Sequence, residues 1–93
     1  MLAEATATPV AAGEFLQTRH EFRELMDRGR CDVIQPDIGR VGGLTEAMRC
    51  AQMAAERALV CVPHGWKTGL TVAATRHFGA AVANCPYTEF FDK

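Results

Sequence analysis

Apolar runs alternate with helix-like patterns along this chain of 93 residues. Four of the runs carry a polar side chain at or near their end: residues 9–14 (PVAAGE), 31–37 (CDVIQPD), 58–64 (ALVCVPH) and 87–91 (YTEFF). The runs are short and continuous rather than strictly alternating, which is typical of parallel strands covered by helices. We therefore predict four strands.

Three segments between these runs have apolar residues at helical spacing. The first begins at Thr18 and can end at Gly29, because glycine commonly closes helices. The second repeats its apolar stripe over residues 44–55, and the third covers residues 69–83. This alternation predicts an α/β fold of the order βαβαβαβ, all parallel, in a single domain over residues 1–93.

The polar residues of the four runs recur at nearly even intervals. Glu14, Asp37, His64 and Glu89 follow one another after 23, 27 and 25 residues. A strand, a turn, a helix and a return loop need about that length. Four such units form a small open sheet or half of a (β/α)8 barrel, whose functional side chains lie at the C-terminal strand ends. We expect these four side chains at one such mouth.

Asp37 and His64 end consecutive strands, and neighbouring strands lie about 4.8 Å apart. A carboxylate that accepts from an imidazole N–H fixes the tautomer of the ring and raises its basicity, so the two residues are candidates for a general acid/base pair. The residues alone leave another interpretation open. Asp37 can be a cap or turn residue before Gly39, and His64 can be a half-buried, hydrogen-bonded histidine.

Glu14 and Glu89 are the other two candidates. A carboxylate oxygen suits a hard cation such as Mg²⁺, so Glu14 is a candidate metal ligand, although it can also be a solvated carboxylate. Glu89 lies between aromatic residues and either faces the site or points to solvent. Trp66 and Lys67 follow the histidine and can line the substrate pocket.

Charge and composition restrict the partners. The net charge is −1 and the basic residues are scattered, so we expect no nucleic-acid partner. The apolar runs are far shorter than a membrane span. The first residues lack the features of a signal peptide, and the four cysteines lack metal-site spacing, so we expect reduced thiols and a cytoplasmic protein.

The stretches PVAAGE, DVIQPDIGRVGGLTEAMRCAQMA, VCVPHGW and TEFF occur in this order over residues 9–91. Together they resemble the enolase superfamily, and within it the mandelate-racemase-like subgroup of the mandelate racemase and muconate lactonizing enzyme family. The resemblance implies the second half, strands five to eight, of a (β/α)7β barrel. It also implies that the capping domain and the first barrel half are absent from this chain.

Enzymes of this superfamily abstract a proton α to a carboxylate and stabilise the resulting anion on Mg²⁺. The resemblance implies that Glu14 is the last of three carboxylate metal ligands and that Asp37 and His64 form the acid/base pair. It implies that Glu89 hydrogen-bonds the substrate carboxylate. The substrate class is then a small carboxylate such as an acid sugar, and the reaction is dehydration or racemisation.

Three hypotheses remain at this point. The chain is the C-terminal part of such an enzyme, or a non-catalytic half-barrel that self-associates, or a small α/β binding module. We expect the 93 residues alone to be inactive, because one carboxylate rarely holds Mg²⁺. We also expect a homo-oligomer, because half a barrel has two open strand edges.

Overall fold

The computed structural model describes residues 2–65 and 68–89. Its centre is a parallel sheet in the order β1-β2-β3. The strands are β1 (Ala11–Ala12), β2 (Val33–Ile34) and β3 (Val60–Cys61). In the register of the sheet, Ala11 pairs with Val33, which pairs in turn with Val60. Helices alternate with these strands, so the predicted parallel α/β fold is confirmed.

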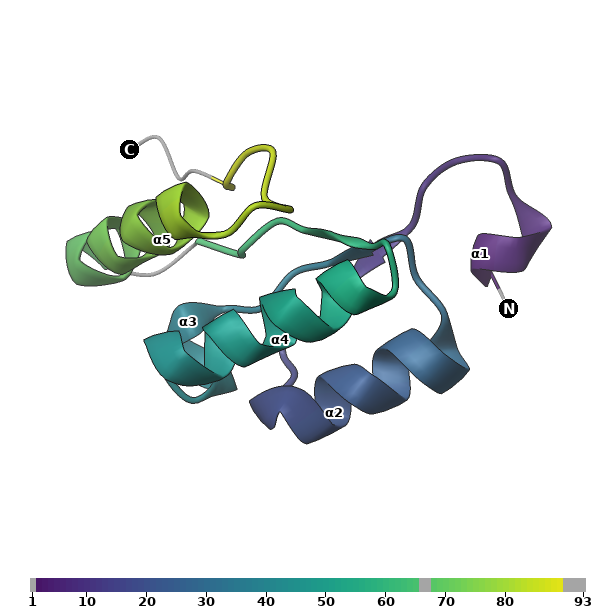
Figure 1. The fold of residues 1–93 in the computed structure, drawn as a ribbon, viewed down its shortest axis with the longest axis horizontal. Coiled ribbons are helices and arrows are strands. Elements are labelled where there is room, and N and C mark those ends of the chain that lie inside the picture. Colours follow the sequence, from purple (N-terminus) through teal and green to yellow (C-terminus); the bar gives the residue numbers. More distant parts are fainter. Residues whose placement is uncertain (1, 66–67, 90–93) are drawn as a thin grey trace.

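The helices agree closely with the apolar stripes of the sequence. Along the described chain they are α1 (Leu2–Ala5), α2 (Thr18–Glu24), the π-helical turn η1 (Leu25–Gly29), α3 (Ile38–Val41), α4 (Leu44–Glu56) and α5 (Gly69–Ala81) (Figure 1). The predicted helix from Thr18 to Gly29 is continuous through α2 and η1. The short helices α1 and α3 have no counterpart in the prediction, because four residues are too few to show a periodic stripe.

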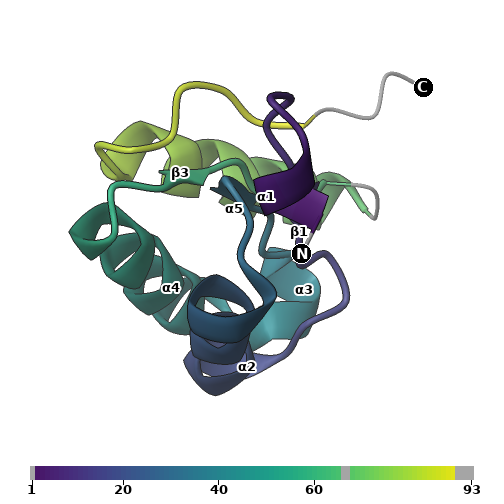
Figure 2. The same ribbon diagram turned by 90° about the vertical axis from the view of Figure 1, so that its right-hand side faces the viewer.

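The core lies between the short strands and the helices that pack on them. Figure 2 shows α2 and α4 on the same side of the strands, and they lie side by side in Figure 1 as well. The buried cluster draws on α2, η1, β2, β3, α3, α4 and α5. Its members are Phe22, Met26, Cys31, Ile34, Ile38, Val41, Ala47, Cys50, Ala51, Ala54, Cys61 and Phe78.

The fourth predicted strand is present only as an irregular segment beside β3. Cys61 N donates to Asn84 O at 3.0 Å, and Glu89 N donates to Pro63 O at 3.3 Å, so residues 84–89 run parallel to the end of β3. No strand is assigned within this described segment. Pro63 and Pro86 each lack a backbone N–H, which interrupts the ladder on both sides. Residues 90 and 91 of the predicted strand lie outside the described residues.

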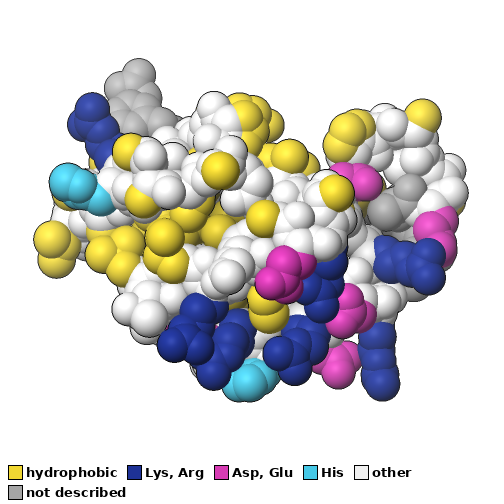
Figure 3. Space-filling model, in the orientation of Figure 1, with side chains coloured by type: hydrophobic (Ala, Val, Ile, Leu, Met, Phe, Trp, Pro, Cys, Tyr) yellow, Lys and Arg dark blue, Asp and Glu magenta, His cyan; other side chains and the backbone are white. Residues whose placement is uncertain are grey.

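The surface carries charges of both signs. On the face shown in Figure 3, Lys and Arg side chains are interspersed with Asp and Glu over α2 and α4, whereas hydrophobic side chains gather between α4 and α5. No helix in the described ranges is both long enough and apolar enough to span a bilayer.

Candidate active site

The ends of the three strands bring their polar residues together. Glu14 follows β1, Asp37 follows β2 and His64 follows β3, each by two or three residues. Asp37 and His64 form a parallel β-bridge, and His64 N donates to Pro36 O at 3.0 Å. The backbone thus fixes the two residues side by side, as the sequence predicted for neighbouring strand ends.

The imidazole of His64 contacts three carboxylates. Its Nδ1 lies 2.8 Å from Asp37 Oδ2, and its Nε2 lies 3.0 Å from Glu14 Oε2 and 3.4 Å from Glu89 Oε1. All four predicted mouth residues therefore meet at one ring. The side chain of His64 is 14% exposed, so a small part of it is still accessible to solvent.

Asp37 is completely buried and has two partners. Its Oδ2 meets the His64 ring, and its Oδ1 accepts from Gly39 N at 2.9 Å, which caps α3. The two interpretations of Asp37, helix cap and histidine partner, therefore hold together. Because a carboxylate only accepts hydrogen bonds, Nδ1 of the ring donates to Asp37. The cap holds the carboxylate and the carboxylate holds the ring.

Glu14 is positioned by the glycine before it. Gly13 has φ +116°, and a Cβ at this position would lie 2.6 Å from Cε1 of the buried Phe22. Only glycine permits both the left-handed backbone and this close approach. The turn brings Glu14 to the histidine while its side chain stays 45% exposed.

Glu89 approaches from the segment beside β3. Its Oε1 accepts from Gly65 N at 3.4 Å, and its side chain is 34% exposed. A Cβ on Gly65 would lie only 2.8 Å from Glu89 O, so this approach also requires a glycine. Glu89 thus faces the histidine, and the interpretation that it points to solvent is wrong. Trp66 and Lys67, predicted to line the pocket, lie outside the described residues.

The described residues do not make a complete metal site. No group of three or more His, Cys, Asp or Glu side chains within residues 2–65 and 68–89 is arranged to hold a metal ion. Glu14 can supply one oxygen ligand of the kind that Mg²⁺ prefers. The chain therefore fits such a centre as the source of one ligand only.

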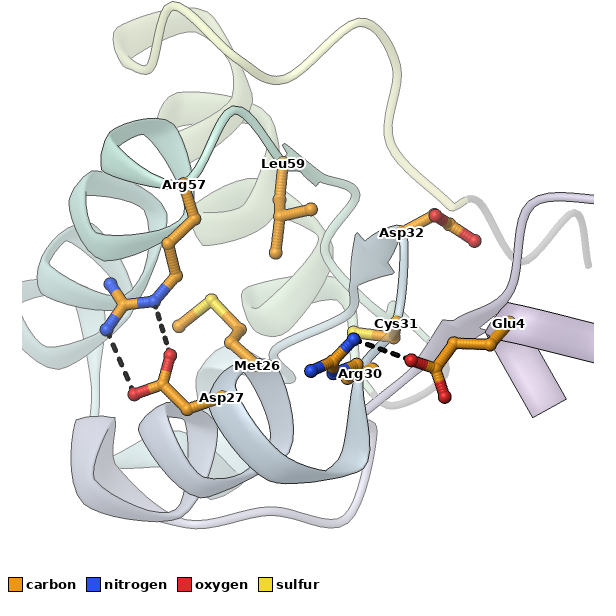
Figure 4. Close-up of a pocket in the computed structure, with 8 residues that line it drawn as sticks. All are labelled: Glu4, Met26, Asp27, Arg30, Cys31, Asp32, Arg57 and Leu59. Atoms are coloured by element: carbon orange, nitrogen blue, oxygen red, sulfur yellow. Dashed lines mark hydrogen bonds and ion pairs between the residues drawn. The ribbon is translucent and has the colours of Figure 1, made fainter. Parts of the chain in front are cut away.

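A second cavity lies at the opposite ends of the strands. It measures about 410 Å³ and is lined by residues that precede β2 and β3, among them Cys31 and Leu59 (Figure 4). Its charged side chains pair across it, Glu4 with Arg30 at 2.6 Å and Asp27 with Arg57 at 2.8 Å. These ion pairs join α1 to the chain after η1 and η1 to the end of α4, so we interpret the cavity as structural.

Two contributors to the site were missed by sequence reasoning. One is Gly65, whose N–H faces Glu89; the close glycine after His64 was the available signal. The other is the contact between Arg40 and Phe15, whose guanidinium carbon lies 4.7 Å from the ring centroid. The sequence could have suggested this contact, because Phe15 directly follows Glu14 and Arg40 follows Asp37 by three residues.

Comparisons with known proteins agree with the geometry. A family model described as enolase C-terminal domain-like matches residues 1–93. The L-rhamnonate dehydratase of Saccharopolyspora erythraea is 37% identical over 81 residues, which are 87% of this chain and 20% of that protein. The chain thus spans about a fifth of the length of this curated relative.

Solved structures show the same fold. The mandelate racemase/muconate lactonizing enzyme from Sulfitobacter sp. superposes with a TM-score of 0.94 at 35% identity, over 99% of this chain and 23% of that one. An enolase from Agrobacterium radiobacter, with Na and L-malate bound, gives 0.92 at 35% identity, over 98% of this chain and 23% of that one. The chain therefore belongs to the enolase C-terminal domain-like family, in the mandelate racemase and muconate lactonizing enzyme branch of the enolase superfamily.

Proposed function

We propose that this chain is the C-terminal half of the barrel of a Mg²⁺-dependent enzyme that moves the proton α to the carboxylate of an acid sugar. Dehydration or racemisation then follows. The observation that carries the proposal is the position of His64, with Nδ1 on buried Asp37 and Nε2 on the partly exposed Glu14 and Glu89. This is the arrangement that a general acid/base histidine needs.

Each residue has a defined part in the proposed reaction. Asp37 orients the ring and stabilises it when it carries a second proton. His64 gives or takes a proton at Nε2, the nitrogen that Glu14 and Glu89 now contact. Glu89, when protonated, donates from its carboxyl O–H to an oxygen of the substrate carboxylate. Substrate binding would therefore replace the present contacts of Nε2 with contacts to the reacting carbon or its hydroxyl.

Magnesium enters the proposal through Glu14. The ion would offset the negative charge that develops on the substrate carboxylate as the α-proton leaves. Mg²⁺ is usually held by more than one carboxylate or by substrate groups as well. Because the described residues offer one ligand, we propose that the remaining ligands belong to the first barrel half of a complete enzyme. The 93 residues would then form one partial barrel domain.

Two relatives support the substrate class. One is named L-rhamnonate dehydratase and another has L-malate bound. Both L-rhamnonate and L-malate are hydroxy acids with a hydrogen on the carbon next to a carboxylate. The unpaired thiols support a cytoplasmic location, where cysteines stay reduced.

The test uses a hybrid enzyme. In the L-rhamnonate dehydratase of Saccharopolyspora erythraea, the matching segment is replaced by this chain, and the hybrid is assayed with Mg²⁺ against a panel of acid sugars. We expect turnover by the hybrid and by its His20→Asn variant, since His20 is exposed on α2. We expect His64→Asn to lower kcat by about 10³-fold and to leave a residual rate. Equal turnover by the two histidine variants, with unchanged circular dichroism, would falsify the proposal.

A second candidate function rests on the incomplete metal site. The isolated chain would be a self-associating half-barrel without activity of its own, because one carboxylate holds Mg²⁺ weakly. We therefore expect no turnover of acid sugars by the 93 residues at millimolar Mg²⁺. Mg²⁺-dependent turnover by the isolated chain that disappears in His64→Asn would contradict this.

A further inference from the structure

The contact between Arg40 and Phe15 joins two of the strand ends that form the site. Phe15 directly follows Glu14, and Arg40 belongs to α3, which Asp37 caps. Within this turn Arg40 N donates to Asp37 O at 2.8 Å, so the backbone of Arg40 adjoins the residue that holds the histidine. The pair therefore lies at the rim of the mouth that holds the histidine.

Neither residue is explained by folding alone. Phe15 is 67% exposed, so its ring contributes little to the core. Arg40 is exposed, and its guanidinium has no hydrogen bond or ion pair to a carboxylate within the described ranges; its guanidinium carbon lies over the Phe15 ring. Stacking occupies one face of the guanidinium and leaves its N–H edge available. That edge matches the two oxygens of a carboxylate.

The negative charge of the site would be offset by a cation at its rim. Three carboxylates surround His64, and a substrate anion that enters is repelled by each of them. A guanidinium held in place before the substrate arrives offsets part of this repulsion and loses little side-chain entropy on binding.

We propose that Arg40, held by Phe15, binds a second carboxylate of the substrate, remote from the carbon that exchanges its proton. The site then selects dicarboxylic hydroxy acids over monocarboxylic ones. This inference rests on the proposed function, because it assigns the substrate class of the same site.

The experiment measures binding to the 93-residue chain by NMR, without turnover. The probes are L-malate and (S)-2-hydroxybutyrate, in which a methyl group replaces the second carboxylate. We expect L-malate to bind about threefold to fivefold more tightly, the upper part of the range for one exposed ion pair. Arg40→Gln removes this preference, and Phe15→Leu reduces it. Arg28→Gln is the matched control and retains it, because Arg28 is exposed on η1 and pairs with Glu24.

Equal affinities for the two acids in the unchanged chain would overturn the inference, as would no binding of L-malate or a preference that survives Arg40→Gln. Circular dichroism checks that each variant is folded. Because the measurement does not involve proton transfer, such a failure overturns the role of Arg40 and leaves the proposed function to the test with His64.

Discussion

At the scale of single residues, the site consists of one imidazole among three carboxylates. The imidazole contacts Asp37 through Nδ1 and Glu14 through Nε2. The two sides differ in burial. Asp37 is fully buried, whereas Glu14 is 45% exposed. Nδ1 is therefore held by Asp37, and Nε2 is the nitrogen at which a proton can be exchanged with a substrate.

Asp37→Asn tests this division of roles in the hybrid enzyme. We expect kcat to fall about 10²-fold or more with little change in KM, because the loss affects proton transfer in the transition state. Asp32→Asn is the control, since Asp32 lies at the other end of the strand and accepts from Val10 N. Steady-state kinetics measures kcat and KM for each variant. A near-normal kcat for Asp37→Asn would show that the carboxylate serves only as a helix cap.

The buried thiols give a prediction about pH. Burial raises the pKa of Cys50 and of Cys61 to about 12, from an ordinary value of 9.0. At pH 8 about one such thiol in 10⁴ is ionised, so iodoacetamide should label Cys85 in the folded chain well before Cys50 or Cys61. In concentrated urea all four cysteines should react. Equal labelling of Cys61 with and without urea would show that its thiol is accessible to solvent in the folded chain.

The same shift sets the direction of a stability change. Because the folded pKa values of these two thiols are raised, the stability they contribute is complete below pH 9. It is lost progressively as the pH rises from 9 toward 12. Urea unfolding at pH 8 and pH 10 should show a lower free energy of unfolding at pH 10, and Cys61→Ala should weaken that dependence.

At the scale of elements, the side chain of Asn84 joins the start of the segment after α5 to two other parts of the fold. Asn84 Nδ2 donates to Ala51 O on α4 and to Leu59 O before β3, both at 3.1 Å. These bonds fix the start of the segment that brings Glu89 to the histidine. A side chain far from the mouth therefore helps to position a site residue.

Asn84→Ala should lower the free energy of unfolding by about 2 kcal/mol, because it leaves two partly buried carbonyl oxygens without this donor. Gln52→Ala on the exposed face of α4 is the control and should change stability by less than about 0.5 kcal/mol. Urea unfolding followed by circular dichroism measures both. A change for Asn84→Ala no larger than the control would show that the two bonds contribute nothing.

The elements also show what a sequence pattern can and cannot predict. The helices were predictable because their stripes are long and are bounded by residues such as Gly29. The meeting of Asp37 and His64 was predictable because strand ends in a parallel sheet meet at one edge. The irregular segment near Glu89 was not, because Pro63 and Pro86 interrupt its pairing. The bonds of Asn84 were not either, since they depend on packing between distant elements.

At the scale of the whole molecule, the sheet is open. β1 and β3 are its outer strands over the described residues, and β3 is covered only by an irregular segment. The relatives are four to five times longer, so in them further chain is available to close the barrel. In the isolated chain the inner strand face has no such cover. An apolar face of a few hundred Å² does not usually stay exposed on a monomer.

We therefore expect the isolated chain to form a homo-oligomer, most simply a twofold dimer that pairs strand edges or covers the inner faces. Light scattering and sedimentation at micromolar concentration measure the mass directly. A compact monomer that unfolds cooperatively at that concentration would contradict the expectation.

The central claim is that Asp37 acts through His64, and one double-mutant cycle on kcat in the hybrid enzyme tests it most directly. We predict that Asp37→Asn lowers kcat about 10²-fold or more when His64 is present. In a His64→Asn background it should lower kcat less than about threefold, because the group it serves is gone. The same large reduction in both backgrounds would contradict the account.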